Sequence, residues 1–105
     1  SMGTQRWQKM VRPYWRTGEP KTYVDIGQLY SKKGDSKNAI DFYKRALESD
    51  AEYPEAHYGL AEEYAKTNLR GKAIESYRHA ARLGVPAAKK ALQKFGVAEE
   101  AQGKR

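Results

Sequence analysis

Apolar side chains recur along this chain at intervals of three and four residues, the spacing that places them on one face of an α-helix. The clearest example is the segment 36–49, whose apolar residues are Ala39, Ile40, Tyr43, Ala46 and Leu47. Apolar faces of the same kind occur in the segments 21–32, 55–66, 70–83 and 86–95. The pattern predicts a chain built from α-helices that are joined by short turns.

Residues that favour the first turn of a helix stand at the starts of these segments. Pro20, Pro54 and Pro86 each open a segment, and proline suits a first turn because its missing N–H would have no partner there. Asp35 or Ser36 is expected to accept the free N–H groups at the start of the second helix. These signals place the expected helix boundaries.

The connections between the helices contain residues that tolerate unusual backbone angles. Gly34 lies in the first turn, and Asn68 takes the corresponding place in the third, where a left-handed backbone is expected. Gly84 and Gly96 follow the last two helices as C-caps. The sequence therefore predicts successive helix–turn–helix pairs.

The first 19 residues are expected to form a separate basic and aromatic segment. Trp7, Met10 and Val11 fall at helical spacing and predict a short helix over residues 4–12. Pro13 limits this helix, because the residue before a proline avoids the α region.

Three further stretches are expected to lie outside the packed helices. Residues 13–19 are predicted to be a linker, and residues 97–105 have little to bury and are expected to form a flexible tail. Ser1-Met2 is interpreted as a cloning scar in front of an internal fragment of a longer protein.

Two parts of the chain repeat one another at a single constant offset. The matched pairs are Ile26 and Leu60, Gly27 and Ala61, Tyr30 and Tyr64, Ala39 and Ala73, Ile40 and Ile74, Tyr43 and Tyr77, and Ala46 and Ala80. The offset is about 34 residues, and an internal period between about 20 and 50 residues indicates a repeat architecture. The small residues are expected to let paired helices approach closely, with the tyrosines filling the space beside them.

These repeated residues resemble the tetratricopeptide repeat (TPR) family, whose unit is a helix–turn–helix. The resemblance covers about residues 20–86 and implies an all-α fold, a short α-solenoid of two repeats, 20–53 and 54–86. A terminal helix over 86–95 completes the expected domain, 20–96. Such folds usually need about three units, so something is expected to cover the end faces of this one. The candidates are the tryptophan-bearing N-terminal segment, the final helix, self-association, and the rest of a longer parent protein, of which the last is favoured, with Trp7 and Trp15 as partial covers.

The C-terminal end is similar to the related Sel1-like repeats. In those repeats the second helix ends in a pair of alanines and a glycine, and a further helix follows. The matching residues here are Ala80, Ala81, Gly84, Ala87, Ala91 and Leu92.

The TPR resemblance also implies a non-catalytic module that holds a peptide or a partner helix in a groove lined by the first helix of each repeat. By register, the groove residues are Lys21, Val24, Gln28, Ser31, Glu55, Tyr58, Glu62, Lys66 and Lys89, with Gln93 as a possible extension. The alternative is that these residues are simply exposed helix positions. The mixed charge of the groove suits a partner with apolar and basic groups.

The residues at the groove positions argue against one kind of partner. Chaperone-binding members of the family hold a C-terminal carboxylate with a clamp of lysine and asparagine residues. Val24, Gln28 and Gly59 occupy the corresponding positions in this chain. Recognition of a chaperone tail is therefore not expected.

The net charge of +7 lies mainly at the two ends of the chain, whereas the repeats are almost neutral. The basic residues of the N-terminal segment alternate with aromatic ones, in Arg6, Trp7, Lys9, Arg12, Trp15 and Arg16. Rings of this kind stack on bases while the cations contact phosphates, so nucleic-acid binding is kept as an alternative function. The simpler interpretation is that Trp7 and Trp15 dock on the first repeat helix.

The residue inventory argues against an enzyme, a cofactor and a metal site. The chain has no cysteine, which excludes disulfides, thiolate catalysis and cysteine zinc sites. His57 is expected to pack in the core, His79 to face solvent, and Glu62-Glu63 to be an exposed charge pair. No apolar run approaches the roughly 18 residues of a membrane span, so none is expected. Localisation is left open, with the cytoplasm as the default.

Overall fold

The computed structural model describes residues 18–96, and within that range it contains α-helices and no strands. The helices are α2 (Pro20–Lys32), α3 (Ser36–Ser49), α4 (Pro54–Lys66), α5 (Arg70–Arg82) and α6 (Pro86–Lys94). The predicted all-α repeat fold is confirmed. The helix expected over 4–12 and the tail expected over 97–105 lie outside the described residues.

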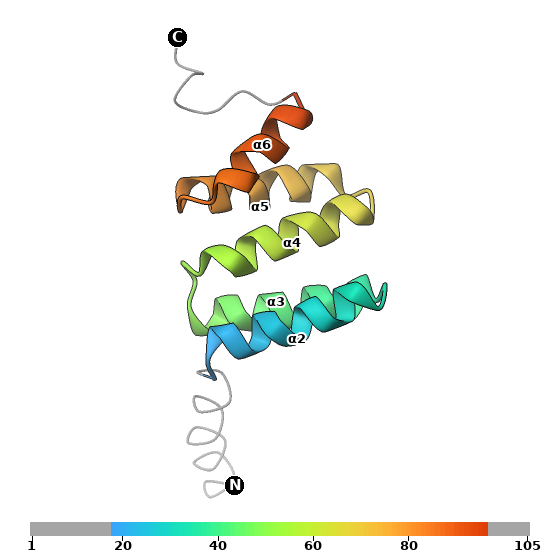
Figure 1. Cartoon of the computed structure of the whole chain (residues 1–105), viewed down its shortest axis with the longest axis vertical. Helices are drawn as coiled ribbons and strands as arrows, with labels where there is room; N and C mark the ends of the chain where they lie inside the picture. The colour runs from blue at the N-terminus through green and yellow to red at the C-terminus, as the bar shows by residue number, and fades with distance from the viewer. Residues whose placement is uncertain (1–17, 97–105) are drawn as a thin grey trace, which may run out of the picture.

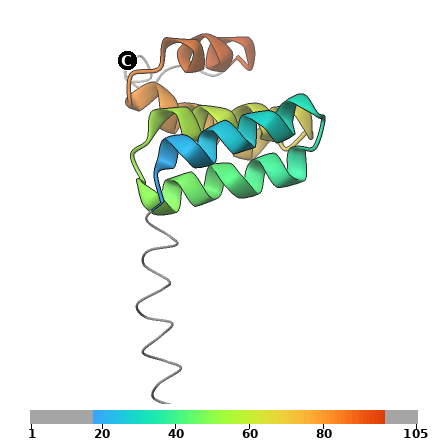
Figure 2. The same ribbon diagram turned by 60° about the horizontal axis from the view of Figure 1, so that its bottom comes forward.

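The helices form two layers that run along one stack (Figure 1). Helices α2, α4 and α6 lie on the side facing the viewer, and α3 and α5 lie behind them. Each helix–turn–helix pair packs on itself, α2 on α3 and α4 on α5, and consecutive pairs meet where α3 contacts α4 and α5 contacts α6. Figure 2 turns the end formed by α2 and α3 toward the viewer. We call the α3–α4 contact the first joint and the α5–α6 contact the second joint.

The helix starts and turns use the residues that the sequence predicts. Pro20, Pro54 and Pro86 are the first residues of α2, α4 and α6. The carboxylate of Asp35 accepts a hydrogen bond from the backbone N–H of Asn38 at 3.1 Å and so caps α3. The side-chain amide of Asn38 and this backbone bond lower the pKa of Asp35.

Two of the turns have a left-handed backbone at the expected positions. Gly34 has a φ angle of 84°, and Asn68 has a φ angle of 63° in the equivalent turn of the second repeat. Asparagine tolerates this conformation better than most side chains, so the second repeat keeps its turn without a glycine.

The core is narrow because it is built around alanine. The alanines with no exposed surface are Ala39, Ala46, Ala56, Ala61, Ala73, Ala80 and Ala88. Tyr43 fills the space at the first joint, where its ring lies against backbone from both α2 and α4. A Cβ added at Gly27 would lie 2.8 Å from this ring, and one added at Gly59 would lie 2.7 Å from it. Both glycines are therefore required for the fit.

The inward face of α2 differs from the expected one. Val24 is only 4% exposed and belongs to the core, whereas it was expected to face a partner. Tyr23 and Tyr30 pack against the core but, like Ile26, are only partly buried. The reason is that α2 ends the described stack, so the side of α2 opposite α4 has no further described helix against it (Figure 2).

Candidate functional site

An open cavity of about 380 Å³ lies at the second joint, where α4, α5 and α6 meet. Helix α4 supplies residues to one wall, α6 supplies the opposite wall, and α5 supplies one ring. The lining residues are Tyr58, Glu62, Ala65, Tyr77, Ala87, Lys90, Ala91, Lys94 and Phe95. We call this feature the α4–α6 cavity.

The cavity exists because α6 is set differently from the other helices of its layer. Helix α2 packs directly on α4, whereas the contacts of α6 are chiefly with α5. Figure 1 shows α6 inclined to α4, while α2 and α4 run side by side. Helix α2 therefore closes the space beside α4 at the first joint, whereas the space between α4 and α6 at the second joint is left open.

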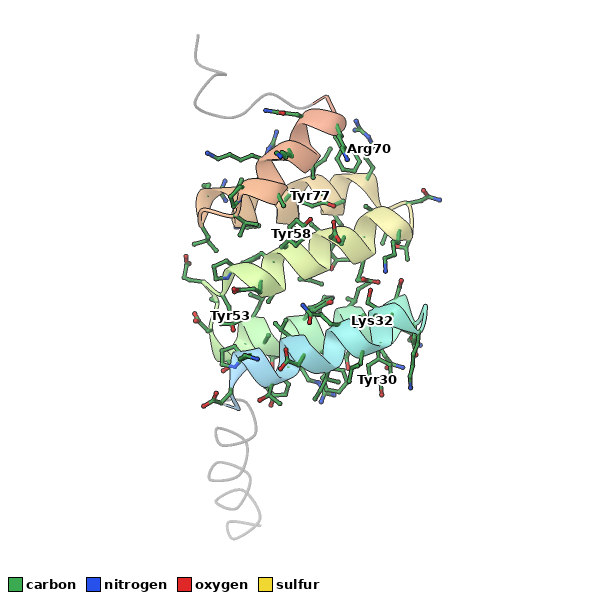
Figure 3. All side chains as sticks on the ribbon, viewed as in Figure 1. Tyr30, Lys32, Tyr53, Tyr58, Arg70 and Tyr77 are labelled. Carbon is green, nitrogen blue, oxygen red and sulfur yellow. The ribbon has the colours of Figure 1, made fainter. Side chains whose placement is uncertain are left out.

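Three aromatic rings follow one another along the cavity. The ring centroids of Tyr58 and Tyr77 are 5.8 Å apart with an interplanar angle of 61°, an edge-to-face arrangement (Figure 3). The ring of Phe95 lies 5.9 Å from Tyr77. Aromatic rings offer a large apolar contact area at a low cost in side-chain entropy.

A carboxylate is held at the edge of these rings. The hydroxyl of Tyr77 donates to a carboxylate oxygen of Glu62 at 3.3 Å. Burial raises the pKa of Tyr77, and the charge of Glu62 raises it further. Burial also raises the pKa of Tyr58, assisted by its hydrogen bond to Glu62. Both phenols are therefore neutral donors at neutral pH, and they orient Glu62 beside the cavity.

Lys90 and Lys94 form the basic wall of the cavity. Both side chains are exposed, and neither has a hydrogen bond or ion pair with any described residue. Lys89 was the expected groove residue of α6, but it does not line the cavity. One residue turns a helix by about 100°, so a shift of one position moves a side chain to another face.

Two of the four groove residues expected on α2 are exposed to solvent, whereas Val24 is not. Gln28 is exposed, and Lys21 is exposed and paired with Asp25 at 3.1 Å. Glu55, on α4, is exposed. The side chain of Val24 is buried in the core and is not available to a partner.

Ser31, which is partly buried, and Lys66, which is exposed, take part in a network around one buried carboxylate. They surround Glu63, which is 1% exposed although it was expected to be a solvated surface charge. Ser31 donates to Glu63 at 2.6 Å, and Ser36 donates to its other oxygen at 2.8 Å. Lys66 lies 3.1 Å from the same carboxylate and donates to Ser31 at 2.7 Å.

The network fixes the first joint. Glu63 comes from the second repeat, whereas Ser31 and Ser36 come from the two helices of the first. A buried carboxylate is tolerated only when its oxygens receive hydrogen bonds or a counter-charge, and here both oxygens do. This group therefore links the two repeats, and the α4–α6 cavity remains the candidate site.

The two histidines come from different layers, His57 from α4 and His79 from α5, and neither lines the α4–α6 cavity. The rings of His57 and His79 are stacked, with centroids 4.8 Å apart, and both are partly buried. His57 also contacts the carbonyl of Ala51 at 2.9 Å. Burial lowers the pKa of His79, and the neighbouring His57 and Arg82 lower it further. His79 thus does not stand alone in solvent as expected.

The remaining findings concern metal ligands, membrane spans and the expected nucleic-acid contacts. Among residues 18–96, no group of three or more histidines or acidic residues is arranged to hold a metal ion. The searched part of the chain has no helix that is both long and apolar enough to span a membrane. The alternative nucleic-acid contacts all lie outside the described residues, and they are Arg6, Trp7, Lys9, Arg12, Trp15 and Arg16.

Comparison with known proteins identifies the repeat. A family model described as "Tetratricopeptide repeat" matches residues 20–53 and again residues 54–83, which together make up more than half of the 105 residues. A search of curated proteins gave no significant match. The Sel1-like character of the C-terminal end stays a prediction.

Proposed function

Because the chain belongs to the tetratricopeptide repeat family, we propose that it is a protein-interaction module that holds one peptide or helix along the layer of α2, α4 and α6. Repeats of this family generally mediate contacts between proteins and are not enzymatic. The solenoid supplies an extended surface, since each unit adds one helix to the same layer. The partner would lie across that layer, and its anchoring side chain would enter the α4–α6 cavity.

The observation that carries this proposal is the chemistry of the cavity. Tyr58, Tyr77 and Phe95 give it apolar walls, and a partner side chain placed there would bury apolar surface on several sides. Glu62 offers an oriented acceptor, and Lys90 and Lys94 offer donors that are paired with none of residues 18–96. An apolar anchor with polar groups beside it suits this arrangement.

The remainder of the layer would contribute orientation more than affinity. Gln28 on α2 and Glu55 on α4 reach solvent, where they can bond to a partner backbone. Lys21 already has Asp25 as a partner, so a new contact would have to replace an existing ion pair. Exposed ion pairs contribute at most about 1 kcal/mol, so this exchange changes affinity little.

The proposal is tested by capturing partners from a lysate of the source cells with the full chain as bait. The groove variant carries Tyr58→Ala, Lys90→Ser and Lys94→Ser, all of which remove cavity atoms. The matched control carries Tyr53→Ala, Lys37→Ser and Lys44→Ser. It removes one partly buried ring and two lysines outside the cavity.

We expect proteins that bind the wild type and the control to be lost with the groove variant, even after nuclease treatment. Binding that survives the groove substitutions would contradict the proposal. Capture that disappears with nuclease and ignores the groove variant would instead assign the function to the basic N-terminal segment. Melting curves of all three chains show whether loss of binding reflects loss of fold.

A further inference from the structure

The α6 wall of the α4–α6 cavity carries positive charge and no negative charge. Four of the residues that α6 contributes fall at intervals of three and four, which places them on one face of the helix. They are Ala87, Lys90, Ala91 and Lys94. The small alanines leave the space beside α4 open, and the two lysines stand about one helical turn apart along it.

No acidic side chain of the described structure neutralises these two lysines. Lys90 and Lys94 have no hydrogen bond or ion pair with any of residues 18–96, although Glu62 lines the same cavity. Glu62 is instead bonded to phenols, since it accepts from the hydroxyl of Tyr77 at 3.3 Å and is also hydrogen-bonded to Tyr58. The ammonium groups of α6 are therefore available to a carboxylate that comes from elsewhere.

The second half of the described structure is basic as a whole. Residues 18–66 contain ten acidic and seven basic residues, whereas residues 67–96 contain one acidic and seven basic residues. The single acidic residue of that second part is Glu75, which does not line the cavity. Charge of one sign over a surface attracts partners of the opposite sign and repels others. The surroundings of the cavity thus favour an acidic partner.

The aromatic rings of the cavity favour an uncharged anchor over a cationic one. Rings can also bind a cation on their faces. A cation here would approach both lysines of α6, and it would also approach Arg70, whose guanidinium lies 5.2 Å from the centre of the Phe95 ring. The volume of about 380 Å³ falls within the range of about 300–1,000 Å³ that is usual for ligand pockets, so one large apolar side chain fits.

We propose that the α4–α6 cavity selects an acidic peptide segment, in which one aromatic or large aliphatic side chain enters the cavity and neighbouring carboxylates pair with Lys90 and Lys94. This inference rests on the proposed function and names the chemistry of its partner. Carboxylates two residues apart on an extended peptide are separated by about 7 Å, and those one turn apart on a helix by about 6 Å. Either spacing matches the two lysines. The charge of this partner is opposite to that expected from the sequence.

The proposal is tested by selecting short random peptides, displayed on phage, against three forms of the full chain. The first is the wild type, and the second carries Lys90→Glu and Lys94→Glu. The third is the matched control, Arg78→Glu with Lys89→Glu, which has the same net charge as the second but changes two exposed residues outside the cavity. A difference between the second and third forms therefore reports on the α6 wall alone.

We expect the wild type and the control to enrich peptides in which aspartate or glutamate lies close to an aromatic or aliphatic residue. The charge-reversed form should enrich peptides with lysine or arginine at the same places. Because both substituted lysines are exposed, the reversal is expected to leave the fold intact, and circular dichroism checks this.

Affinities of one selected acidic peptide, measured by fluorescence anisotropy, separate the two parts of the site. Lys90→Ser and Lys94→Ser should each weaken binding about threefold, whereas Lys89→Ser should not change it. Tyr58→Ala should weaken binding about tenfold or more. Raising the salt concentration should diminish the effect of the lysines and leave that of Tyr58. If Tyr58→Ala does not fold, the lysine variants alone decide.

The outcomes that contradict this inference differ from those that contradict the proposed function. Selected peptides that depend on Tyr58 but show no acidic preference, or the same preference on the charge-reversed form, would overturn the acidic partner alone. If no peptide is enriched, or if the selected peptides bind Tyr58→Ala as well as the wild type, both proposals are wrong. Displacement of the acidic peptide by a mixed-sequence single-stranded oligonucleotide, with the same dependence on Lys90 and Lys94, would assign the α6 wall to nucleic acid instead.

Discussion

The two joints of the helix stack follow one plan but use different chemistry. At each joint, the residue that begins the second helix of one repeat contacts position 10 of the next unit. The opening proline of that unit is counted as position 1. Ser36 meets Glu63 at the first joint, and Arg70 meets Phe95 at the second. The first contact is a buried carboxylate bonded to serines. The second is an exposed guanidinium that lies 5.2 Å from the centre of a ring and bonds to its backbone carbonyl (Figure 3).

The difference separates a joint that is closed by a buried network from one that borders an open cavity. A buried carboxylate costs free energy unless every oxygen is satisfied, so Glu63 accepts only one arrangement of the two repeats. The second joint makes no such demand, because Arg70 stays in contact with water. Its looser geometry coincides with the α4–α6 cavity.

The largest expected effect breaks the first joint at Glu63. Glu63→Ala removes the acceptor of two serine hydroxyls and the partner of Lys66, and should lower the free energy of unfolding by about 3 kcal/mol. Phe95→Ala, at the equivalent place in the second joint, should cost only about 1 kcal/mol because its ring is partly exposed. Urea denaturation measures both values. Equal costs at the two joints would contradict the contrast between them.

A smaller effect is expected where the tyrosine of each joint meets the next helix. Gly59→Leu places a side chain against the ring of Tyr43 and should lower the free energy of unfolding by about 2 kcal/mol, even though leucine favours a helix more than glycine does. Ala91 has the equivalent position in α6 and borders the open cavity. Ala91→Leu should therefore cost less than about 1 kcal/mol. Thermal melts compare the two variants, and a cheaper Gly59→Leu would show that the first joint is not tightly packed.

The third effect appears only in alkali. Burial raises the pKa of Tyr43 to about 12 from the usual 10.0, and the charge of Glu63 adds to the shift. Since the folded state holds this proton more tightly, its contribution to stability is complete below pH 10 and is lost as the pH rises toward 12. Tyr43→Phe cannot ionise and should lose less stability over that interval. Melting temperatures at neutral pH provide the reference, and parallel pH profiles for the two chains would refute the assignment.

Most of the fold could be predicted from local signals. Periodic apolar residues and the three opening prolines placed each described helix within a residue or so, as in α5, which was expected over 70–83 and observed as Arg70–Arg82. The constant offset between the two repeats also predicted which helices pair. These features are local or periodic, so they can be recognised in the sequence alone.

The candidate site could be predicted only in part, for two physical reasons. Glu63 was missed because a charged residue is normally exposed, and its two serine partners lie 27 and 32 residues away on other helices. Lys90 and Lys94 were missed because the third unit begins at Pro86, two residues earlier than the offset of the first two units would place it. Counting from Pro86 would have aligned these lysines with Tyr58 and Glu62.

The inclination of α6 has a consequence for how the molecule opens. Regions with few buried contacts exchange their amide hydrogens through local unfolding, at a lower free energy than the core. Helix α6 buries only Ala88 and Leu92, whereas α4 buries five of its residues. One wall of the α4–α6 cavity is thus a helix with little buried surface, and a ligand seated there would slow the exchange of the α6 amides more than that of the α4 amides. Ordering α6 would reduce the net binding free energy. Substitutions in α6 would therefore change the affinity of the module while changing its stability little.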